Sequence, residues 1–71
     1  MEQWFLIGAN WAANDGKRNV VIEKEYVSRG TRAFMIRNLA TGRLGHIELP
    51  GLTRKFHYTG YDPNYLPNEH E

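Results

Sequence analysis

The sequence contains no cysteine, which excludes a disulfide framework, a thiolate metal site and a cysteine nucleophile. It also lacks a long apolar run: the one at residues 4–9 ends at Asn10, far short of the ~20 residues that a membrane-spanning helix needs. No basic leader precedes this run, so it is a poor signal peptide. We therefore expect a cytoplasmic protein that binds no membrane, and nothing in the sequence indicates a cofactor or a metal ion.

The chain is short and its charges are unevenly distributed. Its 71 residues are enough for one small core, for which we expect a folding free energy of roughly 4 to 10 kcal/mol. All nine Lys and Arg residues lie within residues 1–59 together with five acids, which leaves +4, whereas residues 60–71 carry three acids and no Lys or Arg. The sequence thus predicts a basic domain at 1–59 followed by an acidic tail with prolines and tyrosines at 60–71.

Turn signals divide the basic domain into short segments rich in β-branched and aromatic residues. Asp15-Gly16 is a strong hairpin dipeptide because glycine adopts positive φ without steric cost, and Gly30 and Gly42 mark two further turns. Between Phe34 and Ile36 the residues alternate as in a strand with one buried face. We predict about five short strands, at residues 4–11, 18–27, 32–39, 44–49 and 53–58.

This pattern favours a mainly β fold, namely a small antiparallel meander or a barrel with SH3-like or OB-like closure. The alternative is an α+β fold, since residues 27–39 also fit a helical period, although Gly30 argues against a long helix. The prolines after Gly60 predict an extended tail in which Tyr61, Tyr65 and Leu66 could pack back on the domain and residues 68–71 are disordered. Exposed strand edges would permit a homodimer.

Basic residues interleaved with aromatic ones are the mixture that nucleic-acid grooves use, with cations for phosphates and flat rings for bases. The alternative is purely structural: the cations form a solvated face and the rings form the core. Arg37 shares a strand face with apolar residues, so we expect either a ligand contact or a cross-strand ion pair with Glu48 or Glu25. The nucleic-acid hypothesis uses Arg32, Arg37, Arg43, Arg54, Lys55, Phe56 and Tyr58.

One group of residues resembles an active site. His46 and Glu48 share a strand face, and the group that they form with Arg54, His57 and Tyr58 could supply the base, acid and phosphate-binding cation of a metal-independent ribonuclease. The spacing is unspecific, and two histidines without a third fixed ligand seldom hold a structural ion. We therefore predict no catalytic residues and no metal site.

Aromatic residues and arginines are enriched at protein–protein hot spots. Of the two tryptophans, we expect Trp4 to be buried more readily than Trp11, which borders a turn. Our leading hypothesis is a small non-catalytic module that binds a protein partner and modulates a larger enzyme or assembly. The alternatives are a nucleic-acid-binding β-barrel and, third, a small ribonuclease. The predicted partner-binding residues are Trp11, Arg32, Arg37, Arg43, Arg54, Lys55, Phe56, Tyr58, Tyr61 and Tyr65.

Overall fold

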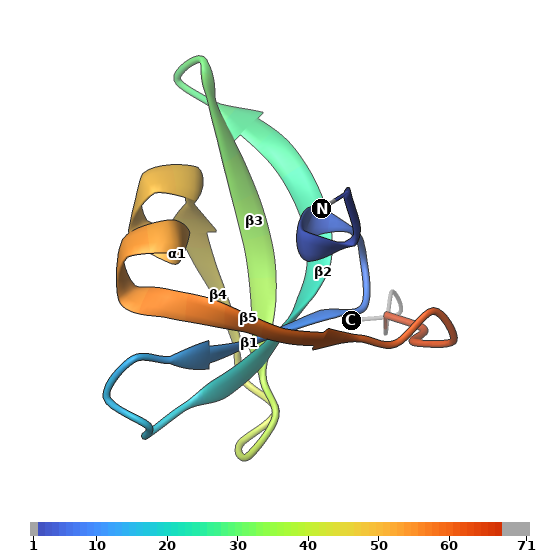
Figure 1. Cartoon of the computed structure of the whole chain (residues 1–71). Coiled ribbons are helices and arrows are strands. Elements are labelled where there is room, and N and C mark those ends of the chain that lie inside the picture. The colour runs from blue at the N-terminus through green and yellow to red at the C-terminus, as the bar shows by residue number, and fades with distance from the viewer. Residues whose placement is uncertain (1, 68–71) are drawn as a thin grey trace.

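The structure is a computed structural model that describes residues 2–67 (Figure 1). Within this range a short 3-10 turn precedes four strands, one short helix and a fifth strand. In chain order they are η1 (Glu2–Phe5), β1 (Ala9–Ala13), β2 (Asn19–Ser28), β3 (Thr31–Asn38), β4 (Leu44–Glu48), α1 (Leu49–Lys55) and β5 (Phe56–Tyr61). None of these helices has the length and apolar character required to cross a membrane.

The strands form one antiparallel sheet in the order β4-β3-β2-β1-β5. The first four strands follow one another as hairpins, and β5 returns to pair with β1 at the opposite edge. The sheet is strongly curved, but its edge strands β4 and β5 are not paired with each other, so it is a meander or an open barrel (Figure 1). The prediction of a mainly β fold with about five short antiparallel strands is confirmed.

The predicted hairpin turns close the meander. Glycines with positive φ lie in all three, including Gly16 at 76° and Gly42 at 77°. Because successive hairpins point in opposite directions, the β1–β2 and β3–β4 turns lie at one end of the sheet and the β2–β3 turn lies at the other (Figure 1). Residues far apart in the sequence therefore share one end of the molecule.

The core lies on the concave face of the sheet. Phe34 is fully buried, and Ile36 is buried beside it, as the alternation predicts. Phe5 from η1 stacks between Trp11 and Phe34 with both centroid distances at 5.6 Å, and Leu52 from α1 is fully buried. The buried core residues are Ala9, Trp11, Ala13, Val20, Ile22, Phe34, Ile36, Leu52 and Phe56.

The first predicted strand is wrong over its first half, and so is the expected order of tryptophan burial. Residues 2–5 form η1, and the strand begins only after Gly8, whose φ of 99° turns the chain. The indole N–H of Trp11 donates to the carbonyl of Trp4 at 2.8 Å, which fixes this turn to the strand. As a result Trp11 is 4% exposed and Trp4 is 43% exposed.

The predicted fifth strand, at 53–58, begins too early. Residues from Leu49 to Lys55 form α1, and Pro50 fits its first turn because a backbone N–H there has no helical partner. Leu52 points from this helix into the core, which gives the short helix its main stabilisation. Strand β5 therefore starts at Phe56 and continues to Tyr61.

The chain after β5 folds back on the sheet. The N–H of Asp62 donates to the carbonyl of Gly8 at 3.0 Å, and that of Tyr65 donates to the carbonyl of Asp62 at 3.2 Å. Tyr61 packs against the core, whereas Leu66 is 84% exposed. The prediction for residues 68–71 lies outside the described residues.

Candidate binding surfaces

Arg37 belongs to a closed hydrogen-bond network with Glu23 and Tyr65. Its Nε and Nη2 donate to the two carboxylate oxygens of Glu23 at 2.6 and 3.3 Å, and its Nη1 donates to the carbonyl of Gly42 at 2.6 Å. The hydroxyl of Tyr65 also donates to Glu23, whose side chain is 5% exposed. The predicted ion pair of Arg37 therefore exists, but its partner is neither Glu48 nor Glu25.

The register of β2 against β3 explains this partner. Arg37 lies opposite Val21, so Glu23, two residues further along β2, is its diagonal neighbour across the sheet. Glu48 is paired with Ala33, four positions further along β3. Alternation along one strand does not give its register against the next strand, so the sequence points to the wrong acids.

The network shifts the ionisation of both acidic partners. Burial alone would raise the pKa of Glu23, but hydrogen bonds from Arg37 and Tyr65 and the charge of Arg37 outweigh it and lower that pKa. Burial and the adjacent Glu23 carboxylate raise the pKa of Tyr65 to about 12. Glu23 is therefore held ionised and Tyr65 is held neutral.

Arg32 is also neutralised within the sheet. Its Nε donates to the carboxylate of Glu25, which raises the pKa of Arg32. Its guanidinium carbon lies 5.1 Å from the ring centre of Phe5 and 5.7 Å from that of Phe34. Arg32 thus covers core rings at the surface, in a pair that is about two-fifths exposed on both sides.

The aromatic residues predicted to bind a partner are largely inside the fold. Trp11 is 4% exposed and Phe56 is 3% exposed. Tyr58 is half-buried, with its ring 5.7 Å from that of Trp4 and 6.0 Å from that of Trp11. Trp11 and Phe56 are therefore core residues in this structure, because both occupy inward positions on β1 and β5.

Five cations gather at the end of the sheet that carries the β1–β2 and β3–β4 turns. The amide N–H and the side chain of Asn14 donate to the carbonyls of Lys55 and Arg54, both at 2.9 Å, which attaches the end of α1 to the β1–β2 turn. Asp15 is the acid on this turn. We call this surface the basic end; its cations are Lys17, Arg18, Arg43, Arg54 and Lys55.

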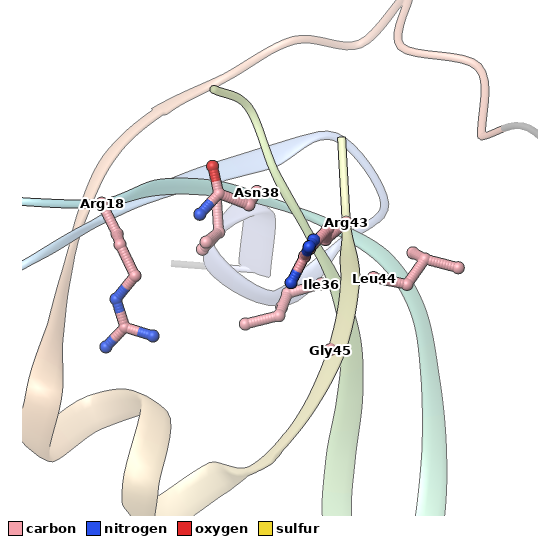
Figure 2. Close-up of a pocket in the computed structure, with 7 residues that line it drawn as sticks. Arg18, Ile36, Asn38, Arg43, Leu44 and Gly45 are labelled. Carbon is pink, nitrogen blue, oxygen red and sulfur yellow. The ribbon is translucent and has the colours of Figure 1, made fainter. Parts of the chain in front are cut away.

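A pocket of about 180 Å³ opens at the basic end. Figure 2 shows the side chains of Arg18 and Arg43 extending into the same space from different hairpins. Within residues 2–67, neither guanidinium forms an ion pair with an acidic side chain. The pocket is lined by Arg18, Val20, Ile36, Asn38, Arg43, Leu44 and Gly45.

Arg18 is a residue that the sequence interpretation missed. Its position gives a usable signal: it follows the first hairpin turn just as Arg43 follows Gly42 in the third, and alternate turns of a meander share one end. The structure thus brings Arg43, Arg54 and Lys55 together with Arg18, and it places Arg32 and Arg37 in ion pairs elsewhere.

A second, mainly apolar surface lies at the N-terminal segment. Leu6 is 47% exposed and Ile7 is 45% exposed, although both are large hydrophobic residues. They line a depression of about 480 Å³ together with Phe5, Lys24, Glu25 and Tyr61. Tyr61, predicted to contact a partner, is half-buried at this surface.

The histidines of the ribonuclease hypothesis have separate neighbours. His46 lies on β4 with its Nδ1 2.9 Å from the hydroxyl of Tyr26, and His57 lies on β5 with its Nδ1 2.9 Å from Oδ1 of Asn14. These are the two opposite edge strands of the sheet. Over the described residues, no three His, Asp or Glu side chains are grouped so as to hold a metal ion. We assign neither histidine a catalytic role.

The chain matches no family model, no curated protein and no solved structure.

Proposed function

We propose that the chain is a small non-catalytic module that binds a protein partner through its basic end and modulates a larger enzyme or assembly. A cytoplasmic location, expected from the composition, is part of the same proposal. The observation that carries it is the pocket between Arg18 and Arg43. Two cations without an acidic partner among the described residues flank an aliphatic surface there, which suits an acidic and apolar segment of another protein.

The position of the rings favours a protein over single-stranded nucleic acid. Base stacking needs exposed aromatic faces, yet Phe56 is buried and lies under Arg18, with 5.1 Å between its ring centre and the guanidinium carbon. Tyr58 is packed between the tryptophans. Among the described residues, neither of these two rings is an open stacking platform, so the basic end offers mainly cations and aliphatic groups.

Affinity capture tests this proposal when matched variants are included. We expect the tagged protein to retain a defined protein from a nuclease-treated lysate, and we expect the double variant Arg18→Gln/Arg43→Gln to lose it. Arg29→Asn is the control: it removes a charge at the opposite end of the sheet, and asparagine tolerates the φ of 56° found there. Retention that is equal for both variants would contradict the proposal.

A second candidate, binding to a nucleic-acid backbone, is favoured by the clustering of five cations at one end of the sheet. Contacts to several phosphates release counterions, so affinity should fall steeply between 50 and about 200 mM salt. A protein interface with an aliphatic contribution should respond less. Loss of all retained material after nuclease treatment, together with a steep salt dependence for a DNA or RNA duplex, would move the assignment to this candidate.

A further inference from the structure

The pocket at the basic end has a floor without polar side chains. Val20 and Ile36 are buried core residues that reach this end of the sheet, and Leu44 forms an aliphatic wall. Gly45 lies opposite Ile36 on β4, and a Cβ built at Gly45 would lie 4.0 Å from Cγ1 of Ile36. The missing side chain at this inward position leaves room for the pocket.

Donors surround this floor. Arg18 and Arg43 each present a guanidinium group that no acid neutralises in the described part of the chain. The side-chain oxygen of Asn38 accepts the N–H groups of Ala40 and Thr41 at 2.8 and 3.2 Å, so its amide nitrogen remains as a further donor on the pocket wall. The rim of the pocket therefore offers donors for an anion.

The volume and the floor together restrict the ligand. About 180 Å³ accommodates a small side chain rather than a nucleotide, and the aliphatic floor has no exposed ring on which a base could stack. Guanidinium groups bind carboxylates in paired, charge-assisted hydrogen bonds. A carboxylate attached directly to a small aliphatic group satisfies both the rim and the floor.

We propose that this pocket binds the C-terminal carboxylate of a partner protein whose last residue is aliphatic. The carboxylate lies between Arg18 and Arg43 and accepts from Asn38, and the last side chain contacts Val20, Ile36 and Leu44. This inference rests on the proposed function for the source of the ligand, but the pocket's preference for an aliphatic carboxylate can be measured without a partner.

Titration of the full chain by two-dimensional NMR tests the preference. The probe is N-acetyl-Gly-Gly-Ala-Leu with a free carboxylate, compared with the same peptide ending in a carboxamide and with inorganic phosphate. We expect the free acid to shift the amide signals of Val20, Ile36 and Gly45, and we expect the carboxamide to bind about tenfold more weakly. Equal affinity of acid and carboxamide, or tighter binding of phosphate than of the peptide, would overturn the proposal.

Three variants locate the site. Arg43→Gln should weaken binding of the free acid about tenfold, because one charge-assisted contact is lost. Gly45→Val should abolish it by filling the floor while both arginines remain, and valine suits a strand. Arg29→Asn, at the opposite end, should leave binding unchanged. Thermal unfolding confirms that each variant is folded, and unaltered binding by folded Gly45→Val would overturn the assignment.

The two proposals fail in different ways. If the pocket prefers the free acid and the variants behave as expected, but no protein is captured from lysate, the carboxylate pocket stands and the regulatory function is overturned. Capture that depends on Arg18 and Arg43 but is not competed by the free-acid peptide would leave the binding module intact and overturn the carboxylate pocket.

Discussion

Arg37 lies near the end of β3 and Arg43 lies just before β4, yet their surroundings differ completely. Arg37 is bound by a buried carboxylate and a backbone carbonyl, and the tail residue Tyr65 completes that network. Arg43 lines an open pocket and has no ion-pair partner within the described residues. The comparison shows that residue type alone does not separate an arginine that is paired across the sheet from one that lacks an acidic partner in the described part of the chain.

The largest effect on stability is expected from removal of the Glu23 carboxylate, which pairs with Arg37. Glu23→Ala leaves Arg37 and Tyr65 without their shared acceptor, and breaking a largely buried pair should lower the free energy of unfolding by about 3 kcal/mol. Urea denaturation measures this loss. A loss below about 1 kcal/mol would show that the network is no more than a surface ion pair.

A second effect concerns the attachment of the tail. Gly8 has a φ of 99°, and a Cβ at this position would lie 2.3 Å from the carbonyl oxygen of Asp62. Gly8→Ala should therefore cost about 2 kcal/mol and displace the segment that carries Tyr65. Faster proteolysis after Tyr61 would report the displacement. Gly16→Ala is the control, since its added Cβ meets no atom within 4 Å, so that only the positive φ is strained.

The ionisation of Tyr65 gives a pH test of the same network. Its pKa is raised to about 12 in the folded state, so the folded protein holds this proton more tightly than the unfolded chain does. The stabilisation is fully present below pH ~10, the usual tyrosine pKa, and is lost as the pH rises towards 12. We expect the Tm of the wild type to fall more steeply than that of Tyr65→Phe over this interval. Parallel curves would exclude the linkage.

The smallest effect on stability is expected at Arg43, which lines the open pocket at the basic end. Arg43→Gln removes a charge with no ion-pair partner among the described residues, so the free energy of unfolding should change by less than about 0.5 kcal/mol. The same substitution should weaken ligand binding, which separates the two roles in one variant. If Arg43→Gln lost as much stability as Glu23→Ala, the difference drawn between Arg37 and Arg43 would be wrong.

The sequence predicts what local chemistry decides. Glycines and Asp15 mark the hairpin turns, and alternation around Phe34 identifies the buried face of β3. It does not predict η1, because residues 4–7 are as apolar as a strand and their turn depends on contacts with Trp11 and the tail. Helix α1 is missed for a related reason, since Pro50 and Gly51 read as a turn and the helix is stabilised by burial of Leu52.

The candidate site is predictable to a similar extent. Arg43, Arg54 and Lys55 are recognised from the sequence as cations available for a ligand, and they lie at the same end of the sheet. Arg37 cannot be separated from them, because the register of β2 against β3, which residue types do not give, determines its partner. The burial of Trp11 and Phe56 is not predicted, because burial in a small curved sheet depends on which residues cover its open sides.

The pairing of β1 with β5 also has a kinetic consequence. Residues 9–13 obtain their second neighbour only from residues 56–61, whereas β2 and β3 are joined by a tight turn. Bringing such distant segments together costs chain entropy before any contact compensates for it, so we expect the β2–β3 hairpin to form early and the β1–β5 pairing to form last. Substitutions in β5 should then accelerate unfolding and leave the refolding rate nearly unchanged, and slowed refolding would reverse this order. Strand β1 would then be the last strand to acquire both of its neighbours.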